Sequence, residues 1–442
     1  MQAERWRVLP DRLSLGSRVM TVIRRAAAVV GHIATALLGA ILLLAPAGVL
    51  VGASAPARAQ MFQMEAAGNE GLISRRSVQL YAKLLGFEQD QLDTALTLYE
   101  GYQAEHNRVR DEQQAFMKKL QEEFEETRDF TVWQKELPKK QQEFAKQMQA
   151  AQTSFLNDVK GLCTPAQEEK WPAVERQRKR EVYLRLPFVA GVSVDVVDCA
   201  RRVGMAPEEG KAPAEVKEAL DEYEMTLDRK LSDVERMVKD AEGKAADMAA
   251  NFDFAKIQEM LKKFSDEAIL IRNINRDSAR RVSALLTDDT RAKFDKEVQR
   301  RSYPRVYRTP YVVRAMDAAV KIKGLDDQQK ADIEQLRAGY EREATPLNQK
   351  WAAAITERED KEGSPYLAMM NWQGEQKDNP VTAARKARRE LDDQFKDRLL
   401  ALLKDDQKQQ LPKEDSVPQG VNAQQMDAME DFMPVDEDEG EE

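Results

Sequence analysis

Gly86-Phe87-Glu88-Gln89-Asp90-Gln91 and Gly324-Leu325-Asp326-Asp327-Gln328-Gln329 are the two stretches that decide the fold of this chain. Each begins with a glycine, which ends a helix by taking a left-handed conformation. An acidic residue follows and can cap the next helix, and Gln or Glu three positions later can return the hydrogen bond. In both copies a tyrosine, Tyr102 or Tyr340, comes 16 residues after the glycine. The two stretches therefore predict the same capped turn between helices.

A looser third copy lies between them. It begins at Gly204-Met205-Ala206-Pro207-Glu208-Glu209 and reaches Tyr223 after 19 residues, as if three residues were inserted near Pro213. The chain thus repeats itself with a period of about 118 residues, which is typical of tandem structural repeats.

A second marker closes each copy. It reads Leu162-Cys163-Thr164-Pro165-Ala166-Gln167, then Leu285-Leu286-Thr287-Asp288-Asp289-Thr290, then Leu402-Leu403-Lys404-Asp405-Asp406-Gln407. Thr164 with Gln167 fits a capping box, and Pro165 stands at the first helical position, where its missing N–H costs nothing. The residues assigned to the repeat motif as helix caps are Gly86, Gln91, Thr164, Gln167, Gly204, Thr287, Gly324, Gln328 and Gln407.

Between the markers, apolar residues recur at helical spacing. In the first copy they are Met148, Ala151, Phe155, Val159 and Leu162, and in the third copy Arg388 stands in line with Leu391, Phe395, Leu399 and Leu402. These stripes predict core faces. Breaks at 129–138, 251–254 and 362–380 would fold each copy into an antiparallel hairpin. The predicted fold is all-α, with three helical-hairpin repeats at 74–186, 187–309 and 310–412.

The first 59 residues predict a targeting segment. A basic stretch precedes an apolar run from Ala26 to Val51, and Ala57-Arg58-Ala59 forms a cleavage signature before Gln60. The alternative is an uncleaved membrane anchor, because the run is long enough to span a bilayer. Either reading predicts an exported protein, periplasmic or secreted, whose only contact with a membrane is this segment.

The acidity of the chain belongs mostly to its C-terminal end. The net charge is −9, and the targeting segment carries seven Arg against Glu4 and Asp11, so the mature chain stands at −9 − 5 = −14. Residues 413–442 hold one Lys and eleven acidic residues, a net of −10, which leaves the folded body near −4. This tail has few large apolar residues and is predicted to be disordered.

Few residues are suited to chemistry or metal binding. His106 is expected to lie exposed on a helix, and Cys163 and Cys199 either form a disulfide or remain two separate thiols. No nucleotide, hydrolase or zinc-protease motif is present. The prediction is a protein that is not an enzyme and that uses no cofactor or metal.

Two basic stretches, 176–180 and 300–314, the second interleaved with tyrosines, raise the possibility of nucleic-acid binding. Export and a nearly balanced body argue against nucleic acid as a partner. We interpret both stretches as solvated helix ends and linkers, with arginine stems over apolar surface.

The pattern from Leu162 through Thr164 to Gln167, echoed at Leu286-Thr287, resembles the LTxxQ motif of the Spy and CpxP type of periplasmic proteins. Those are small helical chaperones and envelope-stress regulators, some linked to heavy-metal resistance. The resemblance implies chaperone-like binding of protein clients or envelope proteins on an amphipathic helical surface. A structural or scaffolding protein of the cell envelope and a metal-binding resistance protein are the alternatives, and the oligomeric state stays open.

Overall fold

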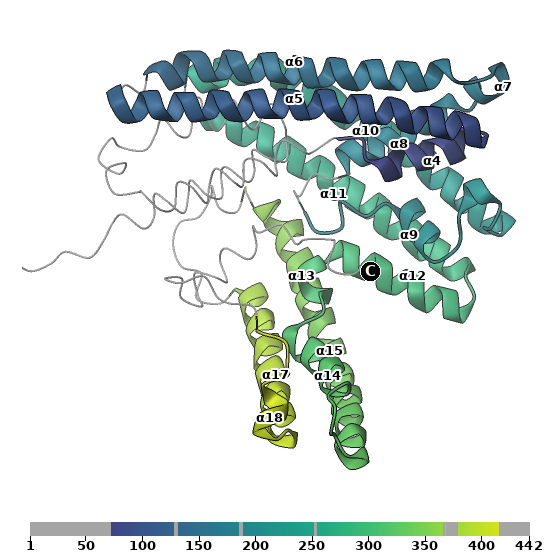
Figure 1. The fold of residues 1–442 in the computed structure, drawn as a ribbon, viewed down its shortest axis with the longest axis vertical. Helices are drawn as coiled ribbons and strands as arrows, with labels where there is room; N and C mark the ends of the chain where they lie inside the picture. The colour runs from purple at the N-terminus through teal and green to yellow at the C-terminus, as the bar shows by residue number, and fades with distance from the viewer. Residues whose placement is uncertain are drawn as a thin grey trace, which may run out of the picture. The chain divides into compact units, whose positions relative to one another are not determined.

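The computed structural model describes residues 72–127, 131–184, 189–251, 254–365, 367 and 379–414. Within these residues every regular element is a helix (Figure 1), which confirms the predicted all-α class. The predicted targeting segment, with its predicted cleavage position at Ala59 and Gln60, lies outside the described residues, as does the chain beyond Glu414.

The helices form two compact units. Unit 1 comprises the described residues of Met1–Pro187 and Ala200–Glu267, and unit 2 those of Phe188–Cys199 and Ala268–Glu442. The predicted repeat 187–309 is therefore divided between the units, so compactness and sequence repetition partition this chain differently.

Unit 1 is built around one long hairpin. Its elements are α4 (Arg75–Leu85), α5 (Gln89–Thr127), α6 (Thr131–Gly161), α7 (Pro165–Glu168), α8 (Trp171–Tyr183), the 3-10 turn η2 (Pro207–Glu209), α10 (Ala214–Asn251) and the beginning of α11 (Phe254–Leu285). Helices α5 and α6 lie side by side along their length (Figure 1), and α8 packs against both α4 and α10. Lys230 of α10 reaches Glu267 of α11 at 2.7 Å.

The core of the first hairpin follows the predicted stripe. Phe155 and Val159 of α6 are buried, and the Phe155 ring stacks on Tyr102 of α5 with 5.2 Å between ring centroids. Tyr81 and Leu85 of α4 complete this core. The helical spacing therefore predicted the face that packs.

The predicted break at 129–138 was too long. Helix α6 begins at Thr131 and runs through Pro138, so only 128–130 separate the described ends of α5 and α6. A proline inside a helix removes one backbone hydrogen bond, at a cost of roughly 3 kcal/mol. Packing along a 31-residue helix outweighs that cost.

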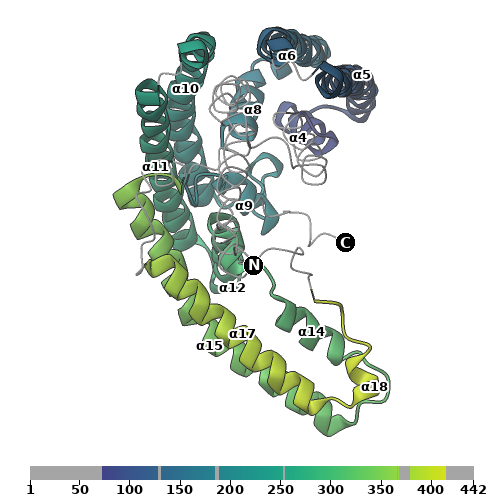
Figure 2. The same cartoon turned by 90° about the vertical axis from the view of Figure 1, so that its left-hand side faces the viewer.

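Unit 2 contains the last hairpin. Its elements are the rest of α11, α12 (Asp288–Ser302), α13 (Pro304–Tyr307), α14 (Tyr311–Ala319), α15 (Asp327–Glu362), α17 (Pro380–Leu402) and α18 (Asp405–Lys408). Helix α9 (Val196–Arg202) crosses from unit 2 to unit 1 between Cys199 and Ala200. Helices α15 and α17 run side by side (Figure 2), and α14 packs against both.

The core of the last hairpin repeats that of the first, with one exception. Tyr340 meets Phe395 edge to face at 5.4 Å between ring centroids, in the place where Tyr102 stacks on Phe155. Arg388 occupies the place of Met148 in the predicted stripe and is buried. Its guanidinium donates to Asn348 at 2.7 Å and also bonds the Tyr340 hydroxyl and Asp392, so the buried charge is paired.

Candidate functional site

The turn glycines take the predicted conformation. Gly86, Gly204 and Gly324 have φ of 70°, 84° and 94°, in the left-handed region that favours glycine. At the end of α4, the Gly86 N–H donates to Lys83 O and the Phe87 N–H to Ala82 O at 2.9 Å. These bonds close the helix C-terminus and direct the chain into α5.

At the open end of the first hairpin, away from the turn between α5 and α6, Gln91 and Gln167 bind each other. The Gln91 Nε2 donates to Gln167 Oε1 at 2.9 Å, and the Gln167 Nε2 donates to Gln91 Oε1 at 3.0 Å. We call this pair of facing glutamine amides, and its counterpart in the last hairpin, a glutamine clasp.

Each glutamine of the clasp also caps backbone on both sides. Gln91 Nε2 donates to Leu162 O at 2.8 Å, at the end of α6, and Gln167 Nε2 donates to Gly86 O at 2.9 Å, at the end of α4. Their oxygens accept the backbone N–H groups of Glu88 and Thr164. Gln167 thereby completes the capping box predicted with Thr164. Two helix ends more than 70 residues apart in sequence are held by two side chains.

The last hairpin carries a second clasp. Gln329 Nε2 donates to Leu402 O at 2.9 Å and to Gln407 Oε1 at 3.2 Å, and Gln329 closes a capping box with Asp326. Gln407 is buried, and its Oε1 accepts the Lys404 N–H. The bond from α15 to the end of α17 is the same as the bond from α5 to the end of α6.

The assignment of Gln328 to this motif was wrong by one residue. Gln328 donates to Asp332 on the exposed side of α15, and Gln329 is the counterpart of Gln91. Only the third residue after the cap can reach back to the N-cap amide, and one step along a helix turns a side chain by about 100°.

The middle copy has no glutamine at either position. Glu209 stands where the other copies have Gln91 and Gln329, and Thr290 where they have Gln167 and Gln407. Thr287 is the N-cap of α12 by backbone conformation, but its side chain makes no capping bond. Arg291 instead caps the end of α11 by donating to Ser283 O and Leu286 O.

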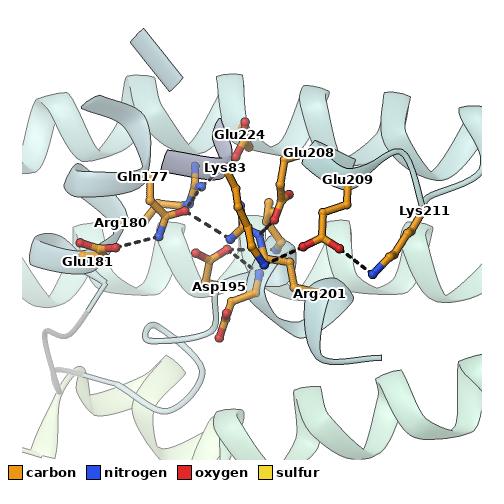
Figure 3. Close-up of polar contacts among 12 residues, drawn as sticks. Lys83, Gln177, Arg180, Glu181, Asp195, Arg201, Glu208, Glu209, Lys211 and Glu224 are labelled. Carbon is orange, nitrogen blue, oxygen red and sulfur yellow. Dashed lines mark hydrogen bonds and ion pairs between the residues drawn. The ribbon is translucent and has the colours of Figure 1, made fainter. Parts of the chain in front are cut away.

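In unit 1, Glu209 belongs to a group of charged and amide side chains that joins α4, α8, α9, η2 and α10, and we call it the junction network (Figure 3). Its members are Lys83, Gln177, Arg180, Glu181, Arg201, Glu208, Glu209, Lys211 and Glu224. Glu209 accepts from Lys83 at 2.7 Å and from Lys211 at 2.6 Å. Hydrogen bonds from Lys211 and Lys83 lower the pKa of Glu209 to about 2.

The buried part of the junction network centres on Arg180 and Gln177. Arg180, 3% exposed, pairs with Glu224 of α10 at 2.8 Å and donates to Gln177 Oε1 at 2.6 Å. Arg201 donates to the same Gln177 oxygen and to Glu208. The interpretation of 176–180 as a solvated helix end was therefore wrong, because acidic residues of α10 lie opposite the basic side of α8.

His106 was expected to be exposed and is buried, at 6% exposure, with its ring 6.4 Å from the Tyr102 ring between centroids. Burial, together with the charge of Arg110, lowers the pKa of His106. The signal was present in the sequence, since His106 falls on the helical stripe of Tyr99, Tyr102 and Val109.

The two cysteines are free thiols in the structure. Cys199 is buried, and burial raises its pKa well above the usual range. Burial also raises the pKa of Cys163, which is partly exposed at the end of α6. Neither thiol has the lowered pKa that activates a nucleophile.

Among the described residues, no three His, Cys, Asp or Glu side chains gather as ligands of a metal ion would. The helices in this part of the chain include none that is both long and apolar enough to cross a membrane. Comparison with protein families, curated proteins and solved structures gives no match.

Proposed function

We propose that this chain is an exported helical protein, not an enzyme, that binds unfolded or partly folded protein clients on the surfaces of three tandem hairpin repeats, 74–186, 187–309 and 310–412. Nucleic acid is not part of this proposal. The paired arginines of the junction network support that exclusion, because their charge is already used within the protein.

The observation that carries the proposal is the recurrence of the glutamine clasp. The same bond joins Gln91 to Leu162 O and Gln329 to Leu402 O, each across the open end of a hairpin. Within the LTxxQ-like sequence, Gln167 bonds both Gln91 and Gly86 O, and it thereby holds two helix ends together. The clasps give the repeated hairpins a common structural element, on which the proposed client-binding surfaces would be built.

Exposed apolar side chains on the long helices support client binding. Met225 of α10 is 65% exposed, and Leu270 and Leu285 of α11 are exposed large apolar residues as well. Exposed apolar side chains of this kind suit weak and adaptable contacts with many sequences. Methionine in particular adapts its shape to different partners.

The proposal is tested by the aggregation of a heat-denatured model enzyme, followed by light scattering. The mature chain is expected to suppress aggregation in proportion to its concentration and without ATP. Met225→Lys is expected to weaken the effect, whereas the matched surface change Lys217→Met, elsewhere on α10, is expected to preserve it. No suppression at a tenfold molar excess of the chain would exclude client binding of this kind.

Export is the part of the proposal that rests on the sequence alone. If the targeting segment is removed after Ala59, N-terminal sequencing of the mature protein finds Gln60 first. An intact N-terminus in the membrane fraction would instead indicate an anchor.

The second candidate is a scaffolding protein of the cell envelope. The junction network favours it, because paired charges lock α8 onto α10 and stiffen the path from one hairpin to the next. A scaffold predicts a stable partner in pull-down experiments and no effect on aggregation, so the same light-scattering experiment separates the two functions.

A further inference from the structure

In unit 2 the linker Val189–Val194 is held by side chains of α11 and α15. Asn275 of α11 donates to Gly191 O at 3.1 Å and to Val192 O at 3.0 Å. The Ala190 N–H donates to both oxygens of Glu359 of α15, at 3.1 Å each. Gly191 has φ of 82°, and a Cβ there would lie 3.2 Å from Arg272 Cγ, so the linker lies close against α11.

Glu359 is an unusual residue to find at this place, because it is 2% exposed. Arg272 approaches it only to 3.5 Å, and the other end of the same guanidinium binds Asp360. An ionised carboxylate can accept about four hydrogen bonds. Here the two Glu359 oxygens accept only the Ala190 N–H and a long bond from Arg272. Burial of a charge is costly unless it is well paired and hydrogen-bonded.

We propose that Glu359 is a pH-dependent latch, which holds the linker Val189–Val194 on α11 and α15 most tightly when its carboxyl group is protonated. In the neutral form its carbonyl oxygen still accepts the Ala190 N–H, and no charge remains buried on Glu359. Arg272 keeps its pair with the half-exposed Asp360.

The charged groups that face Glu359 among the described residues are Arg272 from α11 and Arg358 and Asp360 from α15 itself, while the linker presents the Ala190 amide. Burial is the largest effect and, with Asp360, raises the pKa of Glu359 to about 7, against the opposing effects of Ala190, Arg272 and Arg358. A released, solvated Glu359 would have an ordinary pKa near 4.5.

The sign of the pH dependence follows from this difference. Protonation favours the state with the higher pKa, which is the latched state. The latch therefore tightens as the pH falls from about 7 toward 4.5, and it is weakest above 7. Between pH 8 and pH 5.5 the ratio of latched to released linker should rise on the order of tenfold.

The test is hydrogen exchange of the Ala190 amide in the full chain between pH 5.5 and 8, corrected for the pH dependence of the intrinsic exchange rate. Protection in the wild type should fall on the order of tenfold toward pH 8. Glu359→Gln should keep the acid level of protection at every pH. Glu357→Gln, two residues earlier in α15 with a 65% exposed side chain, should behave as the wild type. Wild-type protection that does not change with pH would overturn the latch.

A second variant keeps the proposal testable if Glu359→Gln does not fold. Asp360 is half exposed, so Asp360→Asn should be tolerated. It removes a negative charge beside Glu359 and frees Arg272, so the midpoint of the pH dependence should move to lower pH. An unchanged midpoint, or a shift to higher pH, would overturn the assignment to Glu359.

Discussion

Removal of the Gln167 side chain should weaken two helix ends at once. Gln167→Ala would leave Gln91 without its amide partner, and Thr164 N–H and Gly86 O without their capping bonds. We expect the free energy of unfolding of unit 1 to fall by roughly 1–3 kcal/mol, the usual cost of partly buried groups left unbonded. Urea unfolding followed by circular dichroism measures this change.

Gln89 supplies the control for that experiment. It is an exposed glutamine in the first turn of α5, close to Gln91 in sequence, and its side chain bonds only Asp93. Gln89→Ala should change the unfolding free energy by less than about 0.5 kcal/mol. The double change Gln91→Ala with Gln167→Ala should cost less than the sum of the two single changes, because both remove the same pair. Strict additivity would mean that the clasp bonds contribute nothing.

At this scale the sequence predicted the residue types but not every position. The turn glycines, Thr164 and Gln167 were found because capping depends on neighbours within a few residues. Gln328 was assigned wrongly because two adjacent glutamines follow the acidic cap. Only Gln329 lies at the third position after Asp326, where the side chain points back to the N-cap amide. The reach of Gln91 to Leu162 O was not predictable, since it depends on how two distant helix ends meet.

At the scale of elements, the contact of α8 with α10 should depend on one buried ion pair. Arg180→Ala would leave Glu224, 19% exposed, facing α8 without its closest cation. We expect a loss of roughly 3 kcal/mol of unfolding free energy, because breaking this buried pair leaves Glu224 with only the more distant Arg176, at 3.9 Å. Hydrogen exchange along α8 and α10 would locate the loss, and urea unfolding would measure its size.

Arg108 of α5 is the matched exposed arginine. It also pairs with two glutamates, Glu105 and Glu112, but its side chain is 48% exposed. Arg108→Ala should cost at most about 1 kcal/mol, the range of surface ion pairs. If Arg180→Ala and Arg108→Ala lower the free energy of unfolding equally, the buried pair of the junction network contributes no more to stability than a surface ion pair does.

The elements themselves were largely predictable, and their contacts were not. Apolar spacing predicted α6 and α17 and the faces that they bury, because that pattern is local to each helix. The run Arg176–Arg180 gave no sign of its partner, because the acidic residues of α10 lie more than 40 positions away. A basic stretch is therefore predicted to be solvated unless the helix that packs against it is known.

For the whole molecule, periodicity and compactness lead to different divisions of the chain. The repeat markers are caps and turns, which recur with the sequence whatever the tertiary packing does. Unit 1 nevertheless takes α10 together with the first hairpin, and unit 2 takes most of α11 together with the last hairpin. We expect long-range packing, and not the period of the sequence, to decide which helices unfold together.

This difference leads to a prediction about cooperativity. Native-state hydrogen exchange at rising urea concentration should group α10 with α5 and α6, and residues 271–285 of α11 with α15 and α17. Gln167→Ala should then lower the protection of α10 and leave 271–285 unchanged. If α10 and 271–285 instead exchange as one group, independent of both hairpins, the repeat 187–309 is a folding unit of its own. In that case the cooperative units of unfolding follow the repeats of the sequence, and the contacts within each compact unit do not set them.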